Sequence, residues 1–412
     1  METKRNITWP YVVPILLLAT LLGVYRINAD VYWLDEEVSI MLSGGARYGH
    51  IPFKNLLSLH LEHTWPPLYN LLTTGWAAFA GWSEYSMRVL ALLIGMLSIA
   101  GIYRLGSKLV SPQVGIISAF FLGTSAFYIH YLHEARGYTL YVLLAIASIY
   151  LYRQILTGSH KTKRSTQGLF LLSVTAMLYT HFIATTIYAF LWGHHILHKP
   201  KDIRWHRITR LLLYALLLFS PWIVLGINAA VDESAIPRNM DTFMLLKAIL
   251  LGFGNWIPLY ILGLLTYAAV IIRGKHIGYL WKWAGTVLGL AILINIPTQA
   301  LYHIRHVIII LPSLLVLMAA SVDDIFSRNR AAGITLAVVW AIAGLSGYMS
   351  PDFMNNQPAH VRPITSKTME VMVDTLDACA TENDIAVFYA YEPAGCIPSF
   401  WQRGKIGSIL TR

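Results

Sequence analysis

Charged residues are scarce in this sequence. Asp, Glu, Lys and Arg make up only 13% of its 412 residues, whereas 56% of the residues are hydrophobic. A soluble protein usually carries roughly a quarter charged residues, because its surface faces water. The scarcity of charge therefore excludes an ordinary soluble domain. Apolar runs close to the ~20 residues needed to cross a bilayer recur along the chain, so the sequence predicts an all-α polytopic membrane protein.

Cysteine is nearly absent as well. The two cysteines, Cys379 and Cys396, both lie in the C-terminal stretch. A pair confined to one short soluble segment favours a disulfide, and hence an oxidising compartment, with two free thiols as the alternative. The sequence has no further cysteine that could pair with either of them.

No segment concentrates the positive charge. The chain carries 31 Lys and Arg against 21 Asp and Glu, a formal net charge of +10, but the cations are dispersed among the loops between apolar runs. Dispersed cations argue against a nucleic-acid-binding face. Cationic loops beside membrane helices instead set the orientation of those helices and contact anionic lipid. We therefore expect membrane lipids, and no nucleic acid, among the partners.

The cationic loops also predict which side of the membrane each loop faces. Lys4 and Arg5 precede the first apolar run, and no small-residue cleavage site follows it, so we expect a retained helix with a cytoplasmic N-terminus. The apolar segment 66–82 is decisive, because a crossing there would put the later cationic loops outside. If this segment instead lies along the outer surface, five cationic loops all face the cytoplasm. These loops contain Lys108; Lys161, Lys163 and Arg164; Lys199, Lys201, Arg204, Arg207 and Arg210; Arg273 and Lys275; and Arg328 and Arg330.

This arrangement predicts about 11 transmembrane helices, each near the length that spans a bilayer. The short apolar segment 241–253 is predicted to be a second surface helix. The approximate ranges of the predicted spans are 10–26, 88–106, 113–130, 138–156, 167–180, 182–198, 209–227, 256–272, 279–297, 307–321 and 331–348.

The chain divides into two predicted domains. We expect residues 1–348 to form the transmembrane domain, whose first extracytoplasmic loop, 28–87, carries the juxtamembrane helices. Prolines mark a linker after that domain, and residues 349–412 are predicted to form a small soluble extracytoplasmic domain. Within it, the sequence favours a helix at 368–379 and a strand at 385–389.

Polar residues gather at the outer ends of the predicted helices. Asp35, Glu36 and Glu37 follow the first apolar run, and carboxylates at that depth are costly unless they have a partner or a task. Each group has a purely structural explanation: the acidic cluster could solvate a loop, and Glu134 could pair with Arg136. Taken together, carboxylates and cations from five helix ends converge at one membrane interface. We therefore favour a site that handles an anionic, lipid-borne substrate.

An ordered series of motifs runs along the same helix ends. It consists of Trp33-Leu34-Asp35-Glu36, His63-Thr64-Trp65-Pro66-Pro67-Leu68-Tyr69, Arg88, Glu134-Ala135-Arg136-Gly137-Tyr138, Tyr179-Thr180-His181, and Arg305-His306 followed by Leu311-Pro312. In order and spacing, the series resembles that of the GT-C fold glycosyltransferases, in particular the branch of the protein O-mannosyltransferases and the bacterial aminoarabinose (lipid A) transferase. The resemblance covers residues 10–348. It implies a GT-C fold and an extracytoplasmic site, in the bacterial cytoplasmic (inner) membrane, that uses a polyprenyl-phosphate sugar.

The resemblance also implies that Asp35 is the catalytic base of an inverting displacement, with Glu36 beside it. Cations must hold the departing phosphate, and Arg suits this task because its planar fork binds phosphate oxygens in pairs. The predicted phosphate-binding residues are Arg88, Arg136, Arg305 and His306. The other candidate site residues are His63, Glu134, Tyr138 and His181. No cofactor is predicted: Asp, Glu and His are available for a divalent metal, but no ligand-spacing motif supports one.

The donor would be a polyprenyl-phosphate-linked sugar, and the acceptor a lipid, a glycan or a protein. A lipid-linked oligosaccharide polymerase or ligase would also place its site outside, but the ordered motifs favour a monosaccharide transferase. A transporter or flippase would need charged residues at mid-membrane depth, where the predicted spans are almost wholly apolar. A non-catalytic assembly partner remains an alternative that the sequence does not separate from an enzyme.

The predicted orientation can be tested by cysteine labelling in intact cells. A membrane-impermeant thiol reagent should modify a cysteine placed at Ser83, because this residue follows the surface helix on the outer side. It should leave a cysteine at Ser159 unmodified, because that residue precedes a cytoplasmic cationic loop. The opposite labelling pattern would show that segment 66–82 crosses the membrane.

Overall fold

The computed structural model describes most of the predicted transmembrane domain and little of the C-terminal domain. The predicted helix at 368–379 and both cysteines lie outside the described residues. The described residues are 9–25, 27–28, 32, 34–45, 52–63, 66–158, 162–198, 201–233, 242–271, 277–298, 304–349, 387–388 and 410–411.

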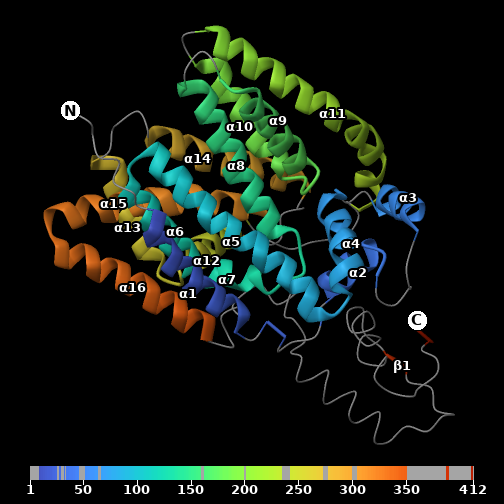
Figure 1. Ribbon diagram of the computed structural model, residues 1–412, viewed down its shortest axis with the longest axis horizontal. Helices are drawn as coiled ribbons and strands as arrows, with labels where there is room; N and C mark the ends of the chain where they lie inside the picture. The colour runs from blue at the N-terminus through green and yellow to red at the C-terminus, as the bar shows by residue number, and fades with distance from the viewer. Residues whose placement is uncertain are drawn as a thin grey trace, which may run out of the picture.

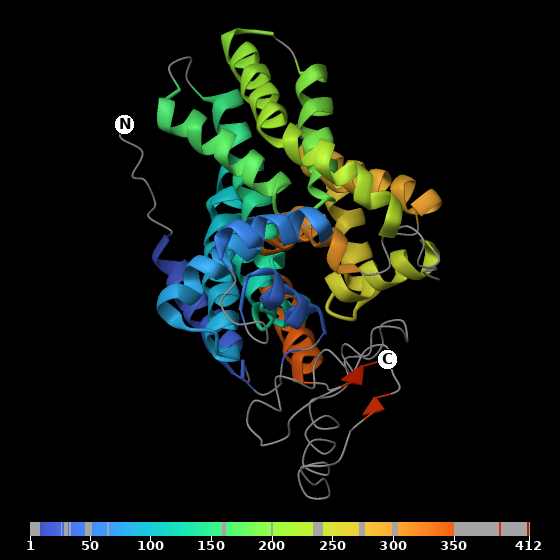
Figure 2. The same ribbon diagram turned by 90° about the vertical axis from the view of Figure 1, so that its right-hand side faces the viewer.

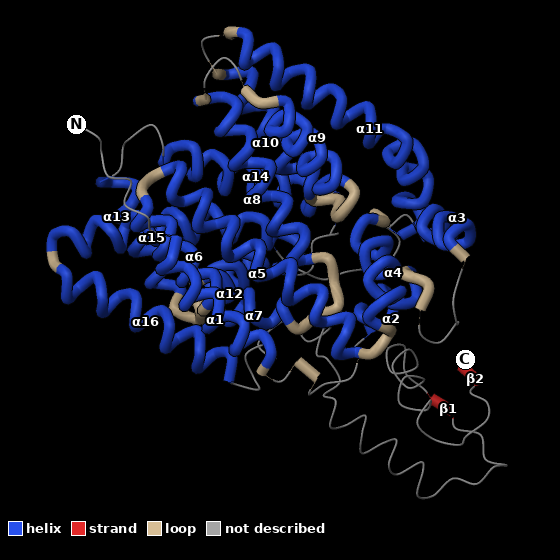
Figure 3. The backbone as a smooth tube through the Cα atoms, in the orientation of Figure 1, coloured by secondary structure: helices blue, strands red, loops and turns tan. Residues whose placement is uncertain are grey.

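Helices account for nearly all of the described chain, which confirms the all-α prediction (Figure 3). The first half contains η1 (Trp9–Tyr11), α1 (Val12–Val24), α2 (Leu34–Leu42), α3 (Phe53–His63), α4 (Leu68–Ala80), α5 (Glu84–Leu109), α6 (Pro112–Gly123), α7 (Ala126–Leu132) and α8 (Tyr138–Thr157). The second half contains α9 (Arg164–Leu178), α10 (Ala184–Leu197), α11 (Ile203–Glu233), α12 (Thr242–Phe253), α13 (Pro258–Ile271), α14 (Ile277–Thr298), η3 (Ile304–Ile310), α15 (Leu311–Arg328) and α16 (Arg330–Met349). Two short strands in the C-terminal stretch, β1 (Val387–Phe388) and β2 (Leu410–Thr411), pair in parallel.

Helix α15 lies at the centre of the bundle. Every residue from Leu311 to Val322 is buried, as expected of a helix that is apolar on all sides. It packs against α6, α13, α14 and α16, while α5 packs against both α6 and α8 (Figure 1). Helices α9, α10 and α11 extend side by side from this core, the short helix α4 lies beside α5, and α2 lies beside α4 (Figure 2).

The lengths of the helices bear on how the chain crosses the membrane. Within the described part of the chain, six helices are long and apolar enough to span it: α5, α8, α11, α14, α16, and α15 together with η3. Two bent pairs, α6 with α7 and α12 with α13, raise the number to as many as eight. The chain is a multi-pass membrane protein, and the number of 11 spans stays a prediction because α1, α9 and α10 are shorter. Helix α4 is only ~20 Å long, which is short for a ~30 Å hydrocarbon core and fits the predicted surface helix.

Serine side chains fix where three core helices begin. The hydroxyl oxygens of Ser83, Ser111 and Ser125 accept hydrogen bonds from backbone N–H groups in the first turns of α5, α6 and α7. Such caps satisfy donors that the helix itself leaves unpaired. Because Ser125 starts a new helix directly after α6, the chain turns by 65° there instead of continuing straight.

Asn255 joins the two bends of the bundle. It lies between α12 and α13, which meet at 83°, and has a left-handed φ of 50° that Asn tolerates better than most residues. Its side-chain oxygen accepts a hydrogen bond from the N–H of Ala126 (3.1 Å), and its amide donates to the carbonyl of Trp340 on α16 (3.2 Å). On α16, Gly344 packs against the backbone of Thr124 where α6 ends, leaving no room for a Cβ atom. One buried amide therefore ties α7, α12 and α16 together.

We predict that Asn255→Ala destabilises the protein strongly. The change leaves the buried N–H of Ala126 without a partner, at a cost of about 1–3 kcal/mol, and removes a second hydrogen bond to the Trp340 carbonyl. It also puts a less tolerant residue at a left-handed φ. The thermal midpoint of the detergent-purified protein should fall clearly further than in Asn329→Ala, which removes only an exposed cap of α16. Equal shifts in the two variants would contradict the role of Asn255.

Candidate active site

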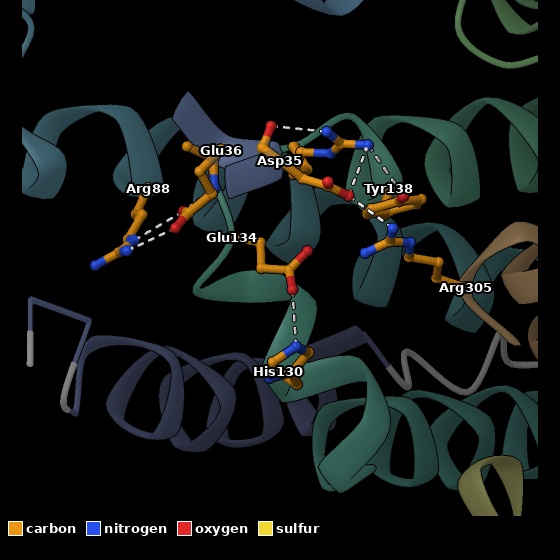
Figure 4. A network of polar contacts seen from close by, with 9 residues as sticks. Asp35, Glu36, Arg88, His130, Glu134, Tyr138 and Arg305 are labelled. Carbon is orange, nitrogen blue, oxygen red and sulfur yellow. Dashed lines mark hydrogen bonds and ion pairs between the residues drawn. The ribbon is translucent and has the colours of Figure 1, made fainter. Parts of the chain in front are cut away.

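The two acidic residues of the first motif point in different directions. Helix α2 begins at Leu34, so Asp35, Glu36 and Glu37 occupy its first turn, where the helix dipole favours carboxylates. Neighbouring residues on a helix project roughly 100° apart. Accordingly, Glu36 is buried beside Arg88, whereas Asp35 faces Arg305 (Figure 4).

Glu36 and Arg88 form a buried two-pronged ion pair. The Nε and Nη2 atoms of Arg88 donate to the two carboxylate oxygens of Glu36 at 2.9 and 2.7 Å, and both side chains are less than 5% exposed. Arg88 Nη1 also donates to the carbonyl of Ile27 (3.1 Å), and Glu36 Oε1 accepts a hydrogen bond from the N–H of Ala135 (2.7 Å). The pair therefore connects α5 and α2 to the turn that follows α1 and the turn that follows α7.

Asp35 lies between two arginines from distant parts of the sequence. Its Oδ2 atom is 2.6 Å from Nη2 of Arg305 and 3.6 Å from Nη2 of Arg136. Arg136 also donates to the backbone carbonyl of Asp35 (2.7 Å) and lies 3.3 Å from the hydroxyl of Tyr138. Both guanidinium groups lie over the Tyr138 ring. Arg305 is almost fully buried, while Asp35 keeps 24% of its side chain exposed, so the carboxylate is the accessible member of this group.

Glu134 has a partner that the sequence analysis did not single out. Its Oε1 atom is 2.8 Å from Nε2 of His130, one helical turn earlier, and Glu134 is buried while His130 is 30% exposed. The i, i+4 spacing of these two residues is the signal that could have revealed the pair. His133, adjacent in sequence, instead packs against Tyr348, and its burial, followed by the charge of His130, lowers its pKa to about 4.

Histidines form the wall of the site next to the arginines. The ring of His181 stacks on Tyr141 at 5.1 Å and lies 5.7 Å from the ring of His306. Removal of the ring from water, followed by the charges of Arg136 and Arg305, lowers the pKa of His181 to about 3. The N–H of Ile183 donates to its Nδ1 atom (3.2 Å), so the proton of the neutral ring is assigned to Nε2.

The helix after the Pro-Pro motif closes this side of the site. The N–H of Leu68, at the start of α4, donates to the carbonyl of Tyr179 (3.1 Å). Tyr69 lies so close to Gly137 that an added Cβ atom would be 3.1 Å from the Tyr69 side chain. Glycine at 137 thus lets α4 rest on the turn that carries Arg136. His63 ends α3, and its side chain and residues 64–65 lie outside the described residues.

The structure brings most of the predicted site residues together. Asp35, Arg136, Tyr138 and Arg305 form one contact group (Figure 4), and His181 and His306 lie beside it. Glu36 and Arg88 instead form a separate buried pair. Within the described part of the chain, no three His, Cys, Asp or Glu side chains lie close enough to hold a metal ion.

The structure is a helical membrane bundle in which the acidic first turn of α2 faces arginines. This arrangement can now be compared with known proteins. The family model described as dolichyl-phosphate-mannose-protein mannosyltransferase matches residues 64–225. The fold matches ArnT from Cupriavidus metallidurans, crystallised with undecaprenyl phosphate (TM-score 0.60, 15% identity, covering 89% of this chain and 69% of ArnT). No curated protein sequence matches.

The fold also matches the oligosaccharyltransferase of Archaeoglobus fulgidus in its apo form, with a TM-score of 0.61 and 11% identity over 92% of this chain and 59% of the enzyme. The archaeal oligosaccharyltransferase AglB from the same organism, in complex with an inhibitory peptide and a dolichol-phosphate, gives a TM-score of 0.58 at 11% identity, over 93% and 59% of the two chains. The chain shares the fold of these enzymes, which is the GT-C fold that its motifs predicted.

The lowered pKa of His181 predicts how stability depends on pH. Between about pH 3 and the ordinary value of ~6.5, the unfolded chain binds a proton at this residue that the folded protein does not. The contribution of neutral His181 to the free energy of unfolding is therefore fully present above that pH range and is lost as the pH falls through it. When the pH is lowered from 7.5 to 4.5, the thermal midpoint of the wild type should fall further than that of His181→Gln, because glutamine does not titrate. A difference independent of pH would contradict the prediction.

Proposed function

We propose that this chain is a membrane glycosyltransferase that moves a sugar from a polyprenyl-phosphate donor to an acceptor at the outer face of the cytoplasmic membrane. The observation that carries the proposal is the position of one accessible carboxylate, Asp35, between the guanidinium groups of Arg136 and Arg305. A base and two phosphate-binding cations thus lie in one site. The lipid phosphates in the structures of ArnT and AglB support a donor of this class.

The cations would act on the leaving group. Arg136 and Arg305 are held in fixed orientations by Tyr138 and the backbone of α2, and guanidinium forks bind phosphate oxygens in pairs. As the bond between C1 of the sugar and the phosphate oxygen breaks, negative charge grows on that oxygen. Fixed positive groups stabilise such charge without reorganising. The Nε2–H of His181 offers a neutral donor nearby.

Asp35 would act on the acceptor. It takes the proton of the acceptor hydroxyl while the acceptor oxygen attacks C1 from the side opposite the phosphate, so the anomeric configuration inverts. In the structure described, Arg305 neutralises this carboxylate at 2.6 Å. A donor phosphate would compete for the same guanidinium group, which would release Asp35 from this ion pair and leave its carboxylate free to face the acceptor. The base would thus become active when the donor is bound.

Glu36 and Arg88 would have a structural task. Both prongs of Arg88 are occupied by Glu36 inside the protein, so we propose that the pair positions α2 and the turn before Arg136. The roles first expected for them, in catalysis and in phosphate binding, stay predictions without geometric support.

A second candidate function is the transfer of a lipid-linked oligosaccharide. The fold similarity to an archaeal oligosaccharyltransferase favours it. The same base and the same phosphate-binding arginines would serve that reaction, with a longer sugar chain on the donor. Release of polyprenyl phosphate from a panel of donors, carrying either one sugar or several, would separate the two.

We predict that Asp35→Asn lowers the rate of sugar transfer by at least roughly 10²-fold, because the amide cannot accept the acceptor proton. Donor binding should be kept or become tighter, since the change also removes the competitor for Arg305. Transfer and donor affinity are measured on the purified variant. Glu37→Gln is the matched control, from the same helical turn. Near-normal turnover in Asp35→Asn, or loss of turnover only in Glu37→Gln, would refute the assignment.

Replacing Arg136 or Arg305 by Ala should weaken donor binding, with Lys restoring it only in part, because an ammonium group lacks the paired fork. Arg330→Ala, an exposed position at the start of α16, should leave donor affinity unchanged. Unchanged donor affinity in both site variants would remove these residues from the phosphate site.

A further inference from the structure

A second group of cationic and aromatic side chains lies at the other end of the bundle. It contains Arg153 of α8, His194 of α10, His198 directly after α10, and Tyr279 and Lys282 of α14, and we refer to it as the distal cluster. Helix α8 begins beside Arg136 and reaches Arg153 roughly 22 Å further on, at 1.5 Å per residue. The distal cluster is therefore separate from the Asp35 site and shares no residue with it.

Ring contacts hold the distal cluster in one arrangement. The guanidinium of Arg153 lies 4.9 Å from the centre of the Tyr279 ring. The ring of His194 meets the same tyrosine edge to face at 4.7 Å and stacks on His198 at 5.9 Å. The hydroxyl of Tyr152 lies 2.8 Å from Nδ1 of His194. Arg153, Tyr279 and the two histidines are thus positioned by packing against each other. Lys282 is exposed.

The charges in the distal cluster are of one sign. The charged groups that act on His194 are Arg153, Lys282 and the neighbouring histidines, all of them basic. The nearest carboxylate to act on His198 is Asp202, which Arg204 already engages through its Nε atom at 2.7 Å. Among the described residues, the Nε of Arg153 and the hydroxyl of Tyr279 are buried atoms without a hydrogen-bond partner. Two buried donors without a described partner therefore lie among basic side chains, and Asp202, the carboxylate that acts on His198, is engaged by Arg204.

We propose that the distal cluster binds a phosphate-bearing anion, either the headgroup of an anionic lipid or free phosphate. Guanidinium and tyrosine donors bind phosphate oxygens through charge-assisted hydrogen bonds, and basic residues beside aromatic rings are common where membrane helices meet lipid headgroups. Ile196 and Leu197, on the same turn of α10 as the histidines, are 54% and 80% exposed and would lie along an acyl chain, which favours the lipid. The proposal is independent of the proposed transferase activity.

The test measures lipid binding to the purified full chain by native mass spectrometry. Phosphatidylglycerol is the anionic probe, phosphatidylcholine the zwitterionic reference, and inorganic phosphate the probe without acyl chains. The wild type should retain phosphatidylglycerol in preference to phosphatidylcholine. Arg153→Gln should weaken that binding about tenfold, the size expected for one charge-assisted hydrogen bond, and Tyr279→Phe should weaken it less. Binding of inorganic phosphate that is equally sensitive to Arg153→Gln would identify free phosphate as the ligand.

The matched control is Arg104→Gln. It removes one exposed positive charge near the C-terminal end of α5 and leaves every residue of the distal cluster in place. It should retain phosphatidylglycerol like the wild type. Arg153→Lys keeps the charge and guards against a folding defect, which gel filtration would also reveal. Equal losses in Arg104→Gln and Arg153→Gln, or no preference for phosphatidylglycerol together with no binding of inorganic phosphate, would overturn the proposal.

Discussion

The buried ion pair between Glu36 and Arg88 is the contact on which the geometry of the site depends. Removing two charges from water is costly, and such a pair persists only with close geometry and further hydrogen bonds. Here the carbonyl of Ile27 and the N–H of Ala135 supply those bonds. Loss of one partner would leave a buried charge uncompensated, at a cost of about 3–5 kcal/mol. The short helix α2 is thereby fixed against α5.

The orientation of Asp35 follows from that pair. With Glu36 directed inward, the preceding residue on α2 is turned toward the end of α8 and toward η3, where Arg136 and Arg305 lie. The N–H of Ala135 bonds to Glu36 and its neighbour Arg136 bonds to the backbone of Asp35. Consecutive residues of the motif after α7 therefore contact consecutive residues of the motif on α2. Glu36 is buried and Asp35 is accessible although they are neighbours, because consecutive side chains on a helix point in different directions.

Bends in the core bring both arginines of the site, Arg136 after α7 and Arg305 on η3, close to each other. If α6 and α7 formed a straight span, Glu134 and Arg136 would follow it along its axis. The 65° bend, with the 83° bend between α12 and α13, instead packs α7 and η3 around α12. Asn255 holds both bends through two hydrogen bonds. The site and the distal cluster lie toward opposite ends of α8, with Arg136 two residues before its start and Arg153 near its end.

Much of this protein could be predicted from the order of its residues. The scarcity of charge and the recurrent apolar runs required helices that cross a membrane, because backbone groups in lipid must pair within their own segment. The polar motifs fell at helix ends because charged side chains are costly elsewhere, so Asp35, Arg136, His181 and Arg305 could be assigned to one interface. The pairing of Arg88 with Glu36 and the bends at Ser125 and Asn255 could not be predicted in this way. Which of two adjacent carboxylates is buried, and which arginine it meets, depends on how helices distant in sequence pack, and no local pattern encodes that packing.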